Sequence, residues 1–128
     1  MKNSITLIMG LAMCATAYAA ADRPNIVIIF NDDMGYADIG CFGSENNKTP
    51  CIDQLAKEGR RFTSFYVASA VCSASRAALM TGCYPQNVGV RGVFFPNRGG
   101  GLDPQHFTVA ELLKSAGYKT LAAGKWHL

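Results

Sequence analysis

Three short groups of polar residues have the types and spacing to do chemistry. The first is the adjacent pair Asp32 and Asp33, which follows an apolar run. Neighbouring carboxylates repel each other unless a cation compensates their charge, and a hard divalent ion prefers oxygen ligands. The pair is therefore a candidate metal-binding site, although two adjacent aspartates are found more often in a solvated turn or a helix cap.

The second group is Cys72, with Arg76 four residues later. A cysteine at the start of a helix lies at the positive end of the helix dipole, and a residue one turn further on lies on the same side. This setting favours an anion or an oxyanion-like group. The alternative is a structural cysteine beside a surface arginine.

The third group is Lys125 and His127. Alternate residues after a strand can point the same way, so this pair could present an ammonium and an imidazole to one small anion. The alternative is a lysine and a histidine on an ordinary exposed loop.

The elements that must position these groups alternate between strand and helix patterns. Apolar, β-branched or aromatic runs predict strands at 25–30, 61–68 and 119–123. Capping residues, prolines and terminal glycines predict helices at 49–59, 73–81 and 108–117, with a loop over 84–104. This order indicates an α/β sheet protein. Because ligands in such sheets bind at the carboxyl ends of strands, we expect the three polar groups at one edge.

The N-terminus has the layout of a secretory signal peptide. Lys2 precedes an apolar run over residues 5–13, and an A-x-A cleavage site follows at 17–19. We predict a signal peptide over residues 1–19, followed by residues 20–128 as the folded part. The run is too short to cross a bilayer, so we expect no stable membrane insertion and a periplasmic or secreted protein. A lipoprotein anchor at Cys14 is the weaker alternative, because Met13 is a poor match before a lipobox cysteine.

The composition limits the class of protein. The chain has 128 residues, of which 49% are hydrophobic and 16% charged, as in one globular domain. The net charge of +3 comes from scattered basic residues, so we expect no nucleic-acid partner. If Cys72 is set aside for chemistry, three cysteines follow the predicted cleavage site, and at least one of them must be unpaired: Cys41, Cys51 and Cys83.

The polar groups fall within motifs that resemble those of the sulfatase family. The run Cys72-x-Ala74-x-Arg76 with residues 77–82 closely resembles the first family signature, and residues 117–128 closely resemble the second. Residues 24–35 look like the family's opening strand and metal loop. The resemblance is nearest to the arylsulfatase A-like type. It implies an α/β fold, the N-terminal part of an alkaline-phosphatase-like mixed sheet flanked by helices, incomplete at this length.

The resemblance also implies a reaction, the hydrolysis of sulfate monoesters of a small molecule or a glycan. Cys72 matches the cysteine that a formylglycine-generating or equivalent maturation enzyme oxidises to formylglycine, an aldehyde that hydrates to a gem-diol. The second hydroxyl lets the carbon expel the sulfate after attack, which a serine could not do. Arg76 matches the arginine that steadies the hydrate. Lys125 matches a lysine on the sulfate oxygens, and His127 matches a histidine bonded to the hydrate that helps the elimination as a base.

The same resemblance implies a divalent cation, usually Ca²⁺ and otherwise Mg²⁺. Asp32 and Asp33 match two of its ligands, and Cys72 after conversion matches a third. Two departures from the family stand out. Cys83 occupies a position where many relatives have arginine, and the family's catalytic domains are several times longer, with further metal ligands beyond this length.

The departure in length leads us to expect an N-terminal portion that is incomplete and inactive by itself. Two other interpretations stay open. One is a phosphoesterase or phosphotransferase of the alkaline-phosphatase-like superfamily, although such an enzyme would use serine or threonine where this chain has Cys72. The other is a non-catalytic sulfatase remnant.

Overall fold

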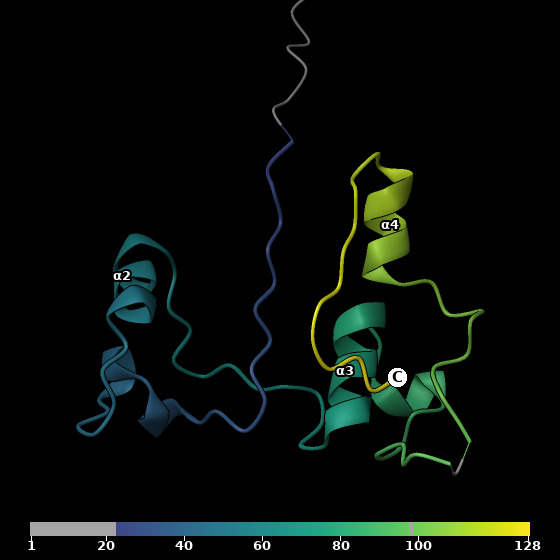
Figure 1. Cartoon of the computed structure of the whole chain (residues 1–128), viewed down its shortest axis with the longest axis horizontal. Helices are drawn as coiled ribbons and strands as arrows, with labels where there is room; N and C mark the ends of the chain where they lie inside the picture. The colour runs from purple at the N-terminus through teal and green to yellow at the C-terminus, as the bar shows by residue number, and fades with distance from the viewer. Residues whose placement is uncertain (1–22, 98) are drawn as a thin grey trace, which may run out of the picture. The chain divides into compact units, whose positions relative to one another are not determined.

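The structure is a computed structural model that describes residues 23–97 and 99–128. The predicted signal peptide and Cys14 lie outside the described residues. The chain divides into two compact units, Met1–Asn31 and Asp32–Leu128. All helices of the described part of the chain belong to the second unit, shown in Figure 1 from blue to yellow.

Helix α2 spans Pro50–Glu58 and has the ends that its sequence predicts. Thr49 is its N-cap, Pro50 occupies the first helical position, and Gly59 is its C-cap. Proline fits there because its missing N–H has no partner inside the helix. Two short 3-10 helices precede α2, and the second of them packs against it: η1, Tyr36–Asp38, and η2, Gly40–Phe42.

Hydrogen bonds from polar side chains join η2 to α2. The Thr49 hydroxyl accepts from the Gly40 N–H at 2.8 Å and donates to Asp53 Oδ1 at 3.0 Å. The same oxygen accepts from the Cys41 N–H at 2.7 Å. We call these four residues the Asp53 network. None of the α2 residues is buried, so these bonds, rather than a core, hold this helix in place.

Helix α3 spans Cys72–Thr81 and carries the apolar core of the second unit. It begins one residue earlier than the sequence predicts, so that Cys72 is its first residue, and it ends at Gly82 with a left-handed φ of 68°. The small residues Ala74 and Ala77 allow close packing against η3, Pro85–Val88. Buried core residues and their partly buried neighbours are Ala74, Ala77, Val88, Val90, Phe94, Leu102 and Leu128.

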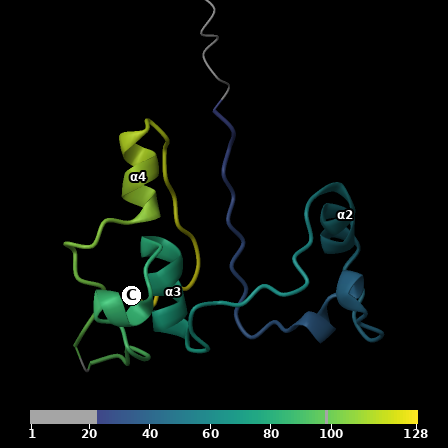
Figure 2. The same cartoon turned by 180° about the vertical axis from the view of Figure 1, so that it is seen from behind.

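Helix α4 spans Val109–Ser115 and contacts α3. It starts with the predicted capping box, in which Thr108 Oγ1 accepts from the Glu111 N–H at 3.3 Å and Glu111 Oε2 accepts from the Thr108 N–H at 2.8 Å. Figures 1 and 2 show the chain after α4 returning beside that helix and ending next to α3. This return brings the last residues of the chain to the core, where Leu128 packs.

The predicted strands at 25–30, 61–68 and 119–123 are wrong for this structure. No strand forms among residues 23–97 and 99–128. A strand needs the main chain of a neighbour for its N–H and C=O groups, and none of these segments takes part in a strand ladder among the described residues. Their apolar side chains are correspondingly open to solvent, with Val27 at 81%, Tyr66 at 83% and Leu121 at 96% exposure. The mixed sheet flanked by helices is therefore absent from the described residues, which contain helices and irregular segments.

Within the part of the chain that the structure describes, no helix combines the length and apolar character that crossing a bilayer requires.

Candidate functional site

Four of the polar residues singled out by the sequence meet in the second unit. The Asp32 carboxylate accepts from Lys125 Nζ at 2.8 Å and forms an ion pair with Arg76 Nη2 at 3.4 Å. Cys72 Sγ lies 3.5 Å from Lys125 Nζ and 3.9 Å from Asp32 Oδ1. We call this group the Asp32 cluster: Asp32, Cys72, Arg76 and Lys125.

Helix α3 fixes two members of the cluster. Cys72 is its first residue and Arg76 follows one turn later, so both side chains lie on the same face. Arg76 also donates from Nη1 to the Lys125 main-chain oxygen at 2.6 Å. The arginine therefore ties the end of the chain to α3 and places the Lys125 ammonium beside the thiol.

The charges in the cluster shift two pKa values. The hydrogen bond from Lys125 and the positive charge of that residue hold the pKa of Asp32 below its ordinary value, with a smaller contribution from Arg76. The hydrogen bond to Asp32 raises the pKa of Lys125 above its ordinary value, and the bond to Cys72 adds to this effect. Asp32 is thus held as the carboxylate and Lys125 as the ammonium, so one carboxylate faces two cations around the thiol. The remaining positive charge, together with the α3 N-terminus, suits an anion.

The second predicted metal ligand, Asp33, is exposed and takes a left-handed φ of 56°. Among the described residues no group of three or more His, Cys, Asp or Glu side chains is arranged to hold a metal ion. Asp32 instead engages two cationic side chains. Since Ca²⁺ takes roughly six to eight oxygen ligands, the donors present here do not by themselves fit a Ca²⁺ or Mg²⁺ site.

His127 makes its contact away from the Asp32 cluster. Its Nε2 lies 2.8 Å from the main-chain oxygen of Phe94. Its backbone is left-handed, with a φ of 59°, which is uncommon for a residue with a side chain. Lys125 and His127 therefore have different contacts, Lys125 with Asp32 and Cys72 and His127 with Phe94.

Ser73 is a polar residue that the sequence analysis missed. It is fully buried, and its hydroxyl accepts from the Phe94 N–H at 3.1 Å. Ser73 therefore bonds to the same residue that His127 contacts. Its position between Cys72 and Ala74 in the motif was visible in the sequence, but no pattern pointed to Phe94, which is 21 residues away.

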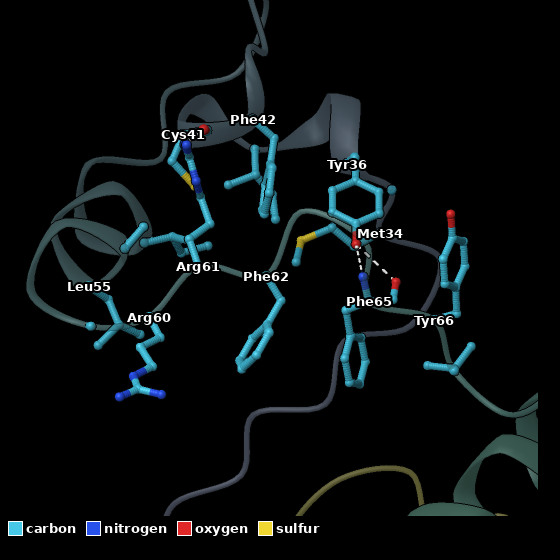
Figure 3. A pocket seen from close by; sticks show the side chains of 16 residues that line it. Met34, Tyr36, Cys41, Phe42, Leu55, Arg60, Arg61, Phe62, Phe65 and Tyr66 are labelled. Atoms are coloured by element: carbon cyan, nitrogen blue, oxygen red, sulfur yellow. Dashed lines mark hydrogen bonds between the residues drawn. The ribbon is translucent and has the colours of Figure 1, made fainter.

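A second feature that the sequence did not reveal is an apolar pocket of about 750 Å³ in residues 34–67. Figure 3 shows its aromatic lining. The Tyr36 hydroxyl accepts from the Phe65 N–H and donates to the Phe65 main-chain oxygen, both at 2.9 Å. Arg61 lies over the Phe42 ring at 5.5 Å and donates to the Cys41 main-chain oxygen. The aromatic residues that the sequence analysis assigned to a strand at 61–68 thus form one wall of this pocket.

Comparison with known proteins gives consistent results. The family model described as Sulfatase matches residues 24–128. The chain is 51% identical to arylsulfatase A of Homo sapiens over 119 residues, covering 92% of this chain and 24% of that protein. It is 47% identical to human steryl-sulfatase over 115 residues, covering 85% and 20% respectively. It is 44% identical to N-acetylgalactosamine-6-sulfatase of Sus scrofa over 118 residues, covering 85% of this chain and 22% of that protein. The chain thus spans less than a quarter of the length of these curated relatives.

Proposed function

Because the chain belongs to the sulfatase family, we propose that the protein hydrolyses sulfate monoesters at the Asp32 cluster. The observation that carries this proposal is the position of the Lys125 ammonium, 3.5 Å from Cys72 Sγ and 2.8 Å from Asp32. A cation at that distance from the reacting position can stabilise negative charge that develops on a sulfuryl group. This arrangement supports the family assignment of the motif and also explains why an anionic substrate would bind here.

Cys72 is proposed to act after conversion to formylglycine. A maturation enzyme, with an oxidant that it brings, would replace the thiol by an aldehyde. One hydroxyl of the hydrated aldehyde would attack sulfur and displace the alcohol of the ester. Deprotonation of the second hydroxyl would then expel sulfate and restore the aldehyde. The exposed cluster supports access for such an enzyme, because Asp32 and Lys125 are 40% and 48% exposed in their side chains.

The residues around position 72 have distinct proposed roles. Lys125 binds the sulfate oxygens, and Arg76 holds the main chain of Lys125 in place through its 2.6 Å bond. The N-terminal N–H groups of α3 add partial positive charge at the same point. We propose His127 as the base for the elimination. Because its Nε2 contacts the Phe94 main-chain oxygen, Nδ1 would be the nitrogen that accepts the proton.

A divalent cation, Ca²⁺ or Mg²⁺, belongs to the proposal as the family's usual ion. Asp32 and Asp33 would contribute oxygen ligands, and the oxygen that replaces the Cys72 thiol a further one. The ion would supply polarisation of the attacking hydroxyl. Because the described residues do not complete its coordination shell, further ligands would have to come from the length of the relatives that this chain does not cover.

The substrate class rests on what the relatives share. Their names mention aryl, steryl and N-acetylgalactosamine sulfates, which have only the sulfate group in common. We accordingly propose a sulfated small molecule or glycan. We also propose that residues 1–19 direct export. The described residues form no strand, and we propose that residues 20–128 become the N-terminal portion of an alkaline-phosphatase-like mixed sheet, flanked by helices, only within a longer protein of the relatives' length. The exposed apolar side chains of 25–30 and 119–123 are of the kind that such a sheet buries.

The test compares an aryl sulfate with the matching aryl phosphate as substrate. The whole protein that contains this chain is produced together with a formylglycine-generating enzyme, and peptide mass spectrometry reads the state of residue 72. We expect an aldehyde at that position and hydrolysis of the sulfate ester in preference to the phosphate ester. Cys72→Ser is the matched control and should abolish sulfate release. Active protein with an intact thiol, or a preference for phosphate, would contradict the proposal.

A further inference from the structure

We propose that Ser73 is a positioning residue that acts through Phe94 to fix the orientation and the tautomer of His127. Ser73 has no exposed surface and lies directly after Cys72 in α3. Its hydroxyl accepts from the Phe94 N–H at 3.1 Å. This hydrogen bond joins α3 to a segment 21 residues further along the chain. The helix does not need it for its own main-chain hydrogen bonds.

Phe94 uses both of its main-chain polar groups. Its N–H donates to Ser73, and its carbonyl oxygen lies 2.8 Å from His127 Nε2. The side chain of Phe94 is also restrained, because it packs against the core around Ala74 and Ala77. A Cβ at Gly100 would lie 2.9 Å from the ring, so only glycine leaves room for Phe94 at this place. The Phe94 carbonyl is thus an acceptor held in a fixed position.

A carbonyl oxygen can only accept a hydrogen bond, so the contact requires a proton on Nε2 of His127. In the neutral ring the lone pair then belongs to Nδ1. Nδ1 of His127 is buried and has no hydrogen-bond partner among the described residues. The Phe94 carbonyl therefore selects which nitrogen of His127 can take up a proton, as such contacts do for other functional histidines.

The backbone of His127 supports the same inference. Its φ of 59° is a conformation that side chains disfavour. The flanking residues help to hold it, since Arg76 binds the Lys125 main-chain oxygen and Leu128 packs on the core. Ser73 and Phe94 add the bond that sets the direction of the ring. The tautomer follows from this chain alone, whereas its catalytic consequence rests on the proposed function.

The first experiment reads the tautomer without any activity. The chain contains two histidines, so ¹⁵N-histidine labelling of the 128 residues gives two imidazole patterns, and His106→Gln assigns them. At a pH where the rings are neutral, we expect His127 to carry its proton on Nε2. Ser73→Ala should mix the two tautomers, and Ser73→Thr, which keeps the hydroxyl, should restore the single one.

Ser75→Ala is the matched control, because Ser75 is a buried serine in the same helix. It should leave the His127 pattern unchanged. A proton on Nδ1 in the wild-type chain, or a Ser73→Ala spectrum identical to that of the wild type, would overturn the proposal. An equal change in both serine variants would also overturn it, since a general loosening of α3 would then explain the result.

The second experiment measures kinetics in the whole, matured protein. Ser73→Ala should lower kcat by about 10- to 100-fold, as expected for a misplaced catalytic group, with KM little changed. Ser73→Thr should recover most of the loss. A change in KM alone contradicts the positioning role. If the wild-type protein hydrolyses no sulfate ester, the proposed function fails, while the tautomer measurement still decides the role of Ser73.

Discussion

Two regions of the second unit are stabilised in different ways. The α2 region, residues 34–67, has no buried apolar residue and is held by the Asp53 network and by the Tyr36–Phe65 hydrogen bonds. The α3 region, residues 69–128, has a small buried core and contains three of the four members of the Asp32 cluster. Apart from Asp32, the side chains of the cluster therefore belong to the region that forms its own core. A core fixes rotamers, and a site that must hold charges a few ångströms apart depends on fixed rotamers.

The largest expected effect is a loss of activity when a cation of the α3 region is removed, compared with removal of a cation from the α2 region. Lys125→Met in the whole, matured protein should lower kcat/KM for an aryl sulfate by about 10²- to 10³-fold, because it removes the cation that we propose binds the sulfate oxygens. Lys57→Met in the last turn of α2 removes the same charge from the other region and should change kcat/KM little. Equal losses in the two variants would show that net charge, and not the position of Lys125, matters.

The next effect concerns the core. Ala77 has no exposed surface and belongs to the same buried cluster as Val88 and Val90, so Ala77→Leu forces extra atoms into a filled space. We expect the free energy of unfolding to fall by about 1–3 kcal/mol in urea titrations. Leu55→Ala in α2 is the comparison, because Leu55 is 65% exposed, and its effect should stay within about 0.5 kcal/mol. A larger loss at Leu55 would mean that the α2 region has a core after all.

A smaller effect should appear in the Asp53 network. A Cβ at Gly40 would lie 2.6 Å from Asp53 Oδ2, so Gly40→Ala displaces the carboxylate that accepts from Cys41. Loss of that bond should destabilise the α2 region by about 1 kcal/mol, measured as faster amide exchange of Cys41. Gly92→Ala is the control, since its Cβ would meet no atom within 4 Å. If the Cys41 amide exchanges at the same rate in both variants, the Asp53 network does not hold α2 in place.

The contrast between the regions also explains which features could be predicted from the sequence. Helix ends depend on neighbours in the chain, so Thr49 with Pro50 and Thr108 with Glu111 located two helix starts correctly. Strands depend on partners that are distant in sequence, and neither the β-branched run at 25–30 nor the segment 119–123 forms a strand here.

The site was predictable only in part. The rule that ligands gather at strand ends pointed to a meeting of Asp32, Cys72 and Lys125, and these residues do meet, although no strand brings them together. The bond between Ser73 and Phe94 joins a side chain to a main-chain group across 21 residues, which no periodicity or motif encodes. The sequence also predicted that His127 would face the same anion as Lys125, but the contact that the structure gives its Nε2 is the main-chain oxygen of Phe94.

The smallest effect tests α4, the helix of the α3 region that has no buried residue. Hydrogen bonds from the Thr108 N–H and hydroxyl hold the pKa of Glu111 below its ordinary value of 4.5. A lowered pKa in the folded chain means that the carboxylate stabilises α4 above the ordinary pKa, and that this stabilisation is lost as the pH falls through the lowered value. Amide exchange of the first turn of α4 should therefore accelerate in acid beyond its intrinsic pH dependence. Glu111→Gln keeps an acceptor for Thr108 but cannot titrate. In this variant, the protection of the first-turn amides of α4 against exchange should therefore not change over the same pH range. If the wild type and the glutamine variant show the same pH dependence, the charge of Glu111 does not cap this helix.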